Sequence, residues 1–347
     1  MKTSMSRLIV GENLKTEEMA GAMRMVMEGL ATPAQIGAFL TALRVKGETT
    51  EEIYGAALVM REKAVRICQG RKGLLDTCGT GGDGKNTFNI STAVAFVVAA
   101  AGLPVAKHGN RAVSSACGSA DVLEELGVNV DLAPSQVECC IEKAGIGFLF
   151  APHFHQAMKH AVGPRRELGF RTIFNVLGPL TNPAGAEVQL MGVYDQKLAP
   201  TLAQVLALLG VKNALVVNGA GGIDELSLAG ENELFRVRQG RVETPLKLVP
   251  EELGLKRAPL EEIRGGDAKR NAELLLVLYQ GALGPHRDVV LLNSAAAFLA
   301  AERVENMGDG VKLAAEIIDS GAALRKLLEL VEVSRRYGRK TEAVACS

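Results

Sequence analysis

The chain has 347 residues, with 39 Lys and Arg against 39 Asp and Glu, 48% hydrophobic residues and 4% aromatic residues. This length allows a large hydrophobic core and about two domains of roughly 150 residues. The balanced charge offers no general attraction for nucleic acid or for an anionic membrane, and the scarcity of aromatic residues argues against a base-stacking surface. We therefore expect neither nucleic acid nor a membrane as a partner.

The sequence predicts no membrane-spanning or secretory segment. Its longest apolar run, residues 93–106, is too short to cross ~30 Å of hydrocarbon and contains Gly102 and Pro104. The first ten residues lack the hydrophobic core of a secretion signal. We therefore expect a cytoplasmic protein.

Residues 1–66 predict a small all-helical unit. Helix starts are indicated at Thr16, at Thr32-Pro33, where Pro takes the first helical position, and at Thr50. Apolar residues recur at helical spacing after these starts, which favours packing between helices over binding of a cofactor. A short polar stretch at 69–73 follows. We expect domains at 1–70 and 71–347, with a helical segment near 165–185 joining the first of them.

From residue 74 onward, short apolar stretches alternate with helical patterns. Strands are predicted at 74–75, 105–106, 146–150, 188–193 and 214–217, and helices at 93–101, 135–144 and 198–209. The alternation predicts an α/β domain with a mostly parallel central sheet.

Three further patterns complete this domain. Ser135 and Glu138 have the spacing of a capping box for the helix at 135–144. Residues 232–248 predict an antiparallel hairpin around Gln239-Gly240. Residues 267–336 predict helices that close the sheet.

A glycine-rich loop follows the first predicted strand. Gly79, Gly81, Gly82 and Gly84 can adopt positive φ and turn successive N–H groups toward one anion. The loop leads into the apolar helix at 93–101, for which Asn89 or Ser91 is a suitable N-cap. Neither the P-loop pattern nor the dinucleotide pattern fits these residues. Strand, glycine loop and helix start together predict a phosphate site.

Polar residues also follow two later strands. The run 107–111, Lys-His-Gly-Asn-Arg, places cations at the sheet edge where α/β proteins bind ligands. Ser115 and Ser119, near a helix start at Gly118, are hydroxyls suited to a phosphate or to N-capping. The pair Asp224-Glu225 lies on a glycine-rich loop after another strand. Such pairs are usually solvated, but beside a diphosphate they suit Mg²⁺.

These motifs resemble those of the anthranilate phosphoribosyltransferases of tryptophan biosynthesis. The similar segments occur in the same order across nearly the whole chain, at 79–83, 89–92, 107–111, 114–115, 118–121, 165–167, 175–183 and 224–225. The chain departs from the family at 218–222, where Asn-Gly-Ala-Gly-Gly replaces the usual His-Gly-x-Asp-Gly. That departure affects the geometry of the loop and leaves the carboxylates in place.

The resemblance implies an enzyme that transfers the phosphoribosyl group of phosphoribosyl pyrophosphate to the amine of anthranilate. It implies an N-terminal helical domain that forms a homodimer and a larger α/β domain of the nucleoside phosphorylase and phosphoribosyltransferase type. It also implies Mg²⁺, as two ions, on Ser91, Asp224 and Glu225. The displacement would proceed at C1 of the ribose through a cation-like sugar, with pyrophosphate as the leaving group.

The resemblance also assigns the substrate residues. Those expected to bind phosphoribosyl pyrophosphate are Gly79, Gly82, Asp83, Thr87, Asn89, Ile90, Ser91, Thr92, Lys107, Ser115 and Ser119. Those expected to bind anthranilate are Gly79, Asn110 and Arg165, since a guanidinium can pair with the substrate carboxylate. An ion pair with Glu167 is the structural alternative for Arg165. Lys107, His108 and Arg165 are the candidate catalytic residues, with His153 and His155 further candidates for a general base.

Two other functions remain open from the residues alone. A pyrimidine nucleoside phosphorylase-like enzyme would share the architecture and the glycine loop but would leave Asp224-Glu225 without a task. A nucleic-acid-binding homologue of this fold would need a basic groove, which a neutral chain does not predict.

Overall fold

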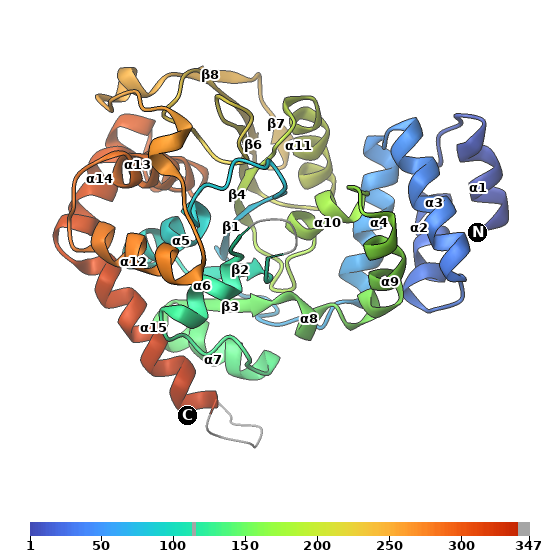
Figure 1. The fold of residues 1–347 in the computed structure, drawn as a ribbon, viewed down its shortest axis with the longest axis horizontal. Coiled ribbons are helices and arrows are strands. Elements are labelled where there is room, and N and C mark those ends of the chain that lie inside the picture. The colour runs from blue at the N-terminus through green and yellow to red at the C-terminus, as the bar shows by residue number, and fades with distance from the viewer. Residues whose placement is uncertain (113–115, 339–347) are drawn as a thin grey trace.

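Four helices form a bundle at the N-terminal end of the chain (Figure 1): α1 (Lys2–Ile9), α2 (Thr16–Met27), α3 (Pro33–Lys46) and α4 (Thr50–Lys63). The computed structural model describes residues 1–112 and 116–338. Thr32 and Thr49 cap α3 and α4, because each side chain accepts the N–H of the third helical residue, whose own side chain accepts in return. The helix starts predicted at Thr16, Thr32-Pro33 and Thr50 are confirmed.

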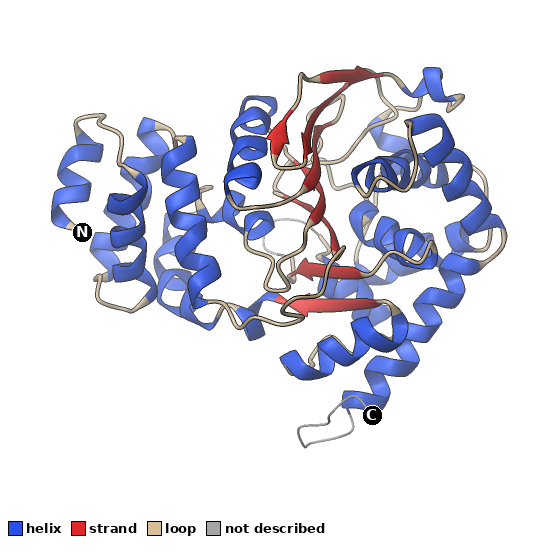
Figure 2. Cartoon of the chain, turned by 180° about the vertical axis from the view of Figure 1, so that it is seen from behind, coloured by secondary structure: helices blue, strands red, loops and turns tan. Residues whose placement is uncertain are grey.

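A mostly parallel sheet forms the centre of the remaining chain (Figure 2). Its strand order is β3-β2-β1-β4-β5-β6-β7, and β8 also pairs with β6. The parallel strands are β1 (Leu75–Gly79), β2 (Val105–Gly109), β3 (Ile146–Phe150), β4 (Val188–Gly192) and β5 (Asn213–Asn218). The antiparallel strands are β6 (Asn232–Arg238), β7 (Arg241–Val242) and β8 (Leu246–Leu248). The predicted parallel sheet and the hairpin around Gln239-Gly240 are confirmed.

Alternate residues of each strand enter two hydrophobic cores on opposite faces of the sheet. On β4, Leu190 belongs to the first core and Met191 to the second. The first core includes helices α5 (Ile90–Ala100), α12 (Ala268–Tyr279), α13 (Pro285–Ala300), α14 (Met307–Asp319) and α15 (Ala322–Gly338). The second core includes α11 (Ala199–Leu208). The helices predicted over 267–336 are therefore confirmed as one layer of the α/β domain.

The second core continues into the N-terminal bundle. Two helices that follow β3 return the chain to the bundle: α9 (Lys159–Leu168) packs against α3, and α10 (Phe174–Leu180) packs against α4. Phe39 of α3 and Leu177 of α10 are both fully buried in this core. The same core also contains α11 and one face of the sheet. The bundle and the sheet are therefore joined by a continuous hydrophobic core as well as by the connecting chain.

The structure corrects two local predictions. The helix expected at 93–101 begins earlier, at Ile90, with Asn89 as its N-cap and no side-chain cap bond. The helix expected at 135–144 is α7 (Pro134–Ala144), and in place of a capping box between Ser135 and Glu138 the Gln136 side chain accepts the N–H of Ala133. Pro134 takes the first helical position, which moves the cap back to Ala133.

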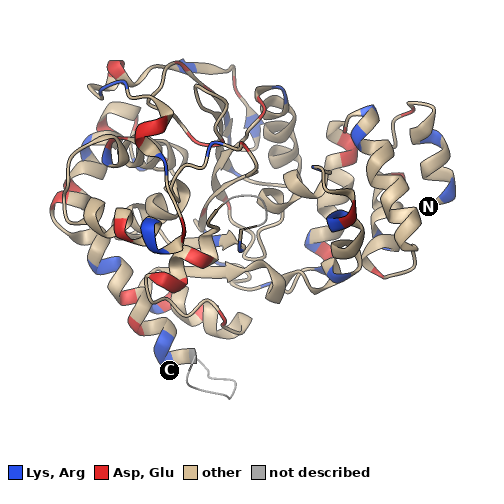
Figure 3. Ribbon diagram, viewed as in Figure 1, with Lys and Arg blue, Asp and Glu red and all other residues tan. Residues whose placement is uncertain are grey.

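The remaining helices of the described chain include α6 (Ser119–Glu125) and α8 (Ala151–Phe154). Across residues 1–112 and 116–338, no helix has both the length and the apolar composition that crossing a lipid bilayer requires. Lys and Arg are interspersed with Asp and Glu in both the bundle and the α/β portion (Figure 3). The charge balance of the whole sequence therefore also holds locally.

Candidate active site

The glycine loop leaves the carboxyl end of β1, next to the ends of β2 and β4. Gly81, Gly82 and Gly84 have φ of +66°, +74° and +73°, as the sequence predicts. Gly79 does not have positive φ, so that part of the prediction is wrong, and glycine is required there for another reason. A Cβ at Gly79 would overlap the Asp224 carboxylate. The loop is therefore built around the carboxylate pair at 224–225.

Two hydrogen bonds attach the glycine loop to the end of β4. The N–H of Thr80 donates to the carbonyl of Gly192 at 3.0 Å, and the Thr80 hydroxyl accepts the N–H of Tyr194 at 3.2 Å. Gly192 itself lies so close to Asp224 that a Cβ would overlap the carbonyl group of Asp224. The end of β4 thus positions the loop on one side and the carboxylate pair on the other.

Three carboxylates form a cluster at this edge of the sheet. One oxygen each from Asp83, Asp224 and Glu225 lies within 4.8 Å of the other two. Asp83 Oδ2 and Glu225 Oε2 are buried and find no hydrogen-bond partner in the described part of the chain. Sequence reasoning assigned Asp83 to the substrate, and its proximity to the pair depends on the path of the loop, which the spacing of residues does not reveal.

The electrostatics of the cluster call for a cation. Burial raises the pKa of Asp224, and the nearby Asp83 charge raises it further. Burial and then the Asp224 charge raise the pKa of Glu225. The Gly81 N–H donates to Asp224 Oδ2 at 2.6 Å and offsets only part of this cost. Hard oxygen donors with unpaired atoms fit a divalent ion such as Mg²⁺.

Ser91 and Lys107 complete the inner wall of the site. The Lys107 ammonium, 3% exposed, donates to the Thr77 carbonyl at 2.7 Å and to the Ser91 hydroxyl at 3.3 Å. Burial lowers the pKa of Lys107, and the buried Asp76 opposes that shift. Ser91, Asp224 and Glu225 line one small cavity, so the structure brings together the three predicted metal ligands.

The start of α5 and the residues just before it supply four more predicted residues. Asn89 links three segments through its side chain, because its Nδ2 donates to the Cys117 carbonyl at 3.4 Å and its Oδ1 accepts from Asn271 Nδ2 at 2.8 Å. Thr87 pairs with Arg264 in an isolated β-bridge. Ile90 and Thr92 are buried. The helix start is therefore fixed from α12 as well as from β1.

The end of β2 brings His108 close to His155, which follows α8. The ring centroids of His108 and His155 lie 5.0 Å apart. Burial lowers the pKa of His108 to about 3, helped by His155, and burial lowers the pKa of His155 to about 4. Both rings are therefore neutral at pH 7 and weak bases. His153 lies elsewhere and pairs with Asp131 at 2.7 Å.

The loop after β2 brings Asn110 and Ser119 together. The Ser119 hydroxyl donates to the Asn110 carbonyl at 3.3 Å, and Ser119 is the first residue of α6. A Cβ at Gly109 would overlap the Ser119 hydroxyl, so glycine at the end of β2 admits this helix. Asn110 is exposed. Ser115 lies outside the described residues.

Arg165 lies on α9, across from the sheet edge. Its guanidinium carbon is 5.0 Å from the centroid of the Phe174 ring. Burial lowers its pKa. None of the ion pairs within residues 1–112 and 116–338 includes Arg165, so the alternative partner Glu167 is not bound to it. A partly buried guanidinium without a carboxylate is available for a substrate carboxylate.

Sequence reasoning missed Arg171 and Tyr194. Arg171 lies between α9 and α10, and its guanidinium carbon is 3.9 Å from the centroid of the Tyr194 ring. Arg171 follows the 165–167 motif closely, but only the folded chain shows which of these cations reaches the glycine loop. Tyr194 follows β4 without any motif of its own.

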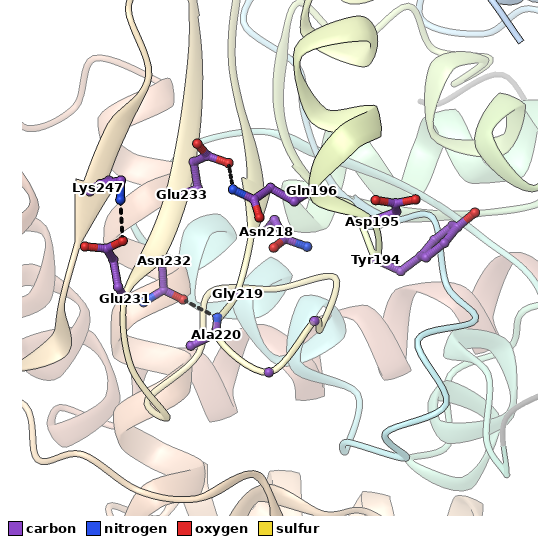
Figure 4. Close-up of a pocket in the computed structure, with 12 residues that line it drawn as sticks. Tyr194, Asp195, Gln196, Asn218, Gly219, Ala220, Glu231, Asn232, Glu233 and Lys247 are labelled. Atoms are coloured by element: carbon purple, nitrogen blue, oxygen red, sulfur yellow. Dashed lines mark hydrogen bonds and ion pairs between the residues drawn. The ribbon is translucent and has the colours of Figure 1, made fainter. Parts of the chain in front are cut away.

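A cavity of about 510 Å³ lies beside the site, at the carboxyl ends of β4 and β5 (Figure 4). Tyr194 and Asp195 border one end, and Glu231 and Lys247 border the other. Its floor includes the atypical loop 218–222. The Asn218 amide donates to the Val193 carbonyl at 2.7 Å, so the residue that departs from the family pattern still holds the loop to the sheet.

Comparison with known proteins agrees with this architecture. Residues 71–324 match the model of the glycosyl transferase family, a/b domain, and residues 2–64 match the helical bundle domain of the same family. An anthranilate phosphoribosyltransferase from Petrotoga mobilis is 55% identical and covers 94% of this chain and 95% of its own length.

Two solved structures are also similar. The crystal structure of anthranilate phosphoribosyltransferase from Thermus thermophilus has a TM-score of 0.91 at 46% identity, covering 96% of this chain and 99% of its own. The Saccharomyces cerevisiae enzyme, solved in complex with PRPP and Mg, has a TM-score of 0.89 at 30% identity, covering 96% and 97%. With this identity over almost its full length, the chain belongs to the anthranilate phosphoribosyltransferase family.

Proposed function

We propose that the carboxylate cluster and the glycine loop of this chain perform the reaction of its family. Phosphoribosyl pyrophosphate and anthranilate give N-(5-phosphoribosyl)anthranilate and pyrophosphate. The C1–oxygen bond to pyrophosphate breaks, the bond from C1 to the amine nitrogen forms, and the nitrogen then loses its proton. The observation that supports this most directly is the approach of Asp83, Asp224 and Glu225 to one another beside the bare backbone of Gly79–Gly84.

The pyrophosphate would lie on the glycine loop and the start of α5. Backbone N–H groups at Gly82, Asn89 and Ser91 are suited to phosphate oxygens, whereas those of Ile90 and Thr92 already donate to the carbonyls of Phe88 and Asn89. Lys107 supplies a buried positive charge. Gly79, Asp83 and Thr87 border the same loop. Ser119, with Ser115, would bind the 5′-phosphate. Charge that develops on the leaving group is thereby stabilised in a site that is already organised.

Ser91, Asp224 and Glu225 would hold Mg²⁺, as two ions shared with the diphosphate. The donor set and the unpaired buried oxygens of the cluster fit this ion. When bound, Mg²⁺ neutralises negative charge on the departing diphosphate. The yeast relative was solved with PRPP and Mg, which supports the same use of magnesium here.

Anthranilate would bind between Arg165, Asn110 and Gly79. Arg165 has no carboxylate partner among the described residues, so the anthranilate carboxylate would supply one. His108 and His155 are neutral and weakly basic, and the arylamine is itself uncharged at neutral pH. Positioning of the amine toward C1, rather than strong base catalysis, would therefore supply most of the acceleration.

The two alternative functions are less well supported. A nucleoside phosphorylase would use inorganic phosphate, which gives a three-carboxylate cluster no evident role. A nucleic-acid-binding homologue would need a surface of one sign, whereas Lys and Arg alternate with Asp and Glu along the described chain (Figure 3). The relatives found at high identity are enzymes named for phosphoribosyl transfer.

The bundle is proposed to form a homodimer, in the cytoplasm. Four large apolar side chains of the bundle are more than half exposed: Ile9, Val10, Leu30 and Val45. Exposed apolar groups that gather on one small unit favour association with a second copy. Light scattering of the purified chain tests this, and a monomeric mass at micromolar concentration contradicts it.

The deciding experiment is an assay with anthranilate and phosphoribosyl pyrophosphate, with and without Mg²⁺. Product is expected only with metal, and Asp224→Asn, Glu225→Gln and Arg165→Ala should each lower turnover at least about a hundredfold. Retention of full turnover by the Asp224→Asn, Glu225→Gln double variant would refute the metal assignment. Absence of turnover by the wild-type chain under all metal conditions would refute the function.

A further inference from the structure

Arg171 contacts the glycine loop at Gly82, although no sequence motif predicts this contact. A Cβ built on Gly82 would lie 2.9 Å from Arg171 Nε and 3.0 Å from the guanidinium carbon. The guanidinium therefore lies directly over the bare backbone of Gly82, which also has φ of +74°. Glycine at this position both permits the turn and leaves room for the cation.

An aromatic ring, and no carboxylate, holds this guanidinium in place. Its carbon lies 3.9 Å from the centroid of Tyr194, and the N–H of Tyr194 donates to the Thr80 hydroxyl in the same loop. Within the part of the chain that the structure describes, no carboxylate oxygen lies within 4.0 Å of an Arg171 nitrogen. The cation is thus oriented but not neutralised, although Asp83 is the next residue after Gly82.

An anion on the Gly82 N–H would contact both the backbone and this guanidinium. Planar guanidinium groups bind two phosphate oxygens at once, and stacking on a ring reduces the freedom that the side chain must lose. We infer that Arg171 is a further ligand of the diphosphate of phosphoribosyl pyrophosphate, positioned by Tyr194. The inference rests on the proposed function, which assigns the diphosphate to Gly82 and its neighbours.

The position of Arg171 in the chain also relates this contact to the helical bundle. The residue lies between α9, which packs against α3, and α10, which packs against α4. A diphosphate bound by both Gly82 and Arg171 would therefore connect the edge of the sheet to the α9–α10 segment, which packs against the bundle. Arg165, proposed for the second substrate, belongs to the same segment, so the two substrates would be held from one side by neighbouring cations.

The test compares Arg171→Gln with the wild-type enzyme in the presence of Mg²⁺. The KM for phosphoribosyl pyrophosphate and the inhibition constant of inorganic pyrophosphate should both rise about ten- to a hundredfold, the usual effect of losing a hydrogen bond between charged groups. The KM for anthranilate should stay within about twofold. Arg171→Lys should recover part of the lost pyrophosphate affinity, because lysine keeps the positive charge but lacks the planar pair of N–H donors.

Variants of Tyr194 separate orientation from charge. Tyr194→Phe keeps the ring and should weaken pyrophosphate inhibition less than Tyr194→Leu, which in turn should weaken it less than Arg171→Gln does. Lys159→Gln, which removes an exposed cation from α9, is the matched control and should change none of these constants.

Unchanged pyrophosphate inhibition in folded Arg171→Gln would overturn the inference. An equal rise in both KM values with a lowered melting temperature would also overturn it, because a packing role gives that result. Calorimetric titration with pyrophosphate and Mg²⁺ gives the same comparison without turnover, so a wild-type chain that binds pyrophosphate but makes no product refutes the proposed function alone. Arg171→Lys serves for the comparison if the Gln variant does not fold.

Discussion

At the scale of single residues, the site depends on where a side chain is missing as much as on where one is present. Gly79 and Gly192 both stand where a Cβ would overlap Asp224. The sequence predicts a phosphate loop at the glycine cluster but attributes Gly79 to positive φ. The structure requires glycine there because Asp224, far away in the chain, approaches it closely. The family resemblance predicts that Ser91, Asp224 and Glu225 lie together, as they do in the structure. It does not predict that Asp83 lies beside the two carboxylates.

Gly79→Ala should disrupt the carboxylate cluster of Asp83, Asp224 and Glu225 without unfolding the protein. The added methyl displaces the Asp224 carboxylate, and small displacements of a catalytic group lower rates by about a hundredfold. We expect kcat/KM to fall at least that far and the Mg²⁺ concentration for half-maximal rate to rise. Steady-state kinetics over a Mg²⁺ series measures both. Wild-type kinetics in this variant would show that the close approach of Gly79 to Asp224 does not affect activity.

His108 should make the fold sensitive to acid. Its pKa falls from 6.5 unfolded to about 3 folded, so below pH 6.5 the unfolded chain binds a proton that the folded chain does not. This lowers the free energy of unfolding as pH falls, by up to about 1.4 kcal/mol per pH unit. His108→Gln should lose less stability than wild type between pH 6.5 and 4.5. Urea titrations at several pH values decide this, and parallel curves for the two proteins would contradict it.

At the scale of elements, short-range patterns predicted most boundaries. The helix starts at Thr32-Pro33 and at Thr50 and the Gln239-Gly240 turn depend on neighbouring residues, so the sequence alone located them. The capping box at Ser135 and Glu138 failed because Pro134 moves the helix start, and the Glu138 carboxylate instead accepts the N–H of Cys68, far away in sequence. Long-range partners of this kind have no signature in spacing.

Glu52 of α4 should be a strong stabiliser of the bundle. Its carboxylate is fully buried and accepts from the N–H groups of Leu14 and Thr49 and from Lys46, each at 2.9 Å. Glu52→Ala leaves these donors unpaired, and we expect the free energy of unfolding to fall by about 3 kcal/mol or more. The neighbouring exposed Glu51→Ala should change it by less than about 0.5 kcal/mol. Equal urea midpoints for both variants would refute this role.

At the scale of the whole molecule, the alternation of strands and helices predicts the fold class. It does not predict that the bundle and the sheet share one hydrophobic core. Helices α9 and α10 return to the bundle after β3, and the core they complete also contains one face of the sheet. The sequence predicts that a helical segment near 165–185 joins the bundle, but it does not indicate that this segment completes a core shared with one face of the sheet. The position of Arg171 over the glycine loop follows from that same return of the chain.

The continuous core predicts that bundle and sheet unfold together. Calorimetry should show one transition, and Glu52→Ala should lower its single midpoint even though the substitution lies in the bundle. Circular dichroism and loss of turnover should then follow the same curve. Two separated transitions, with only the first displaced by Glu52→Ala, would show that the bundle is an independent folding unit.

The close approach of Gly192 to Asp224 also bears on attempts to re-engineer this enzyme. The end of β4 sets the position of the loop that carries Asp224 and Glu225, so any larger residue at 192 would displace that loop from the edge of the sheet. Libraries that aim to accept bulkier arylamines should therefore leave this strand end invariant and vary residues in contact with Arg165, such as Phe174. Acceptor choice could then change while the ion-binding geometry stays the same.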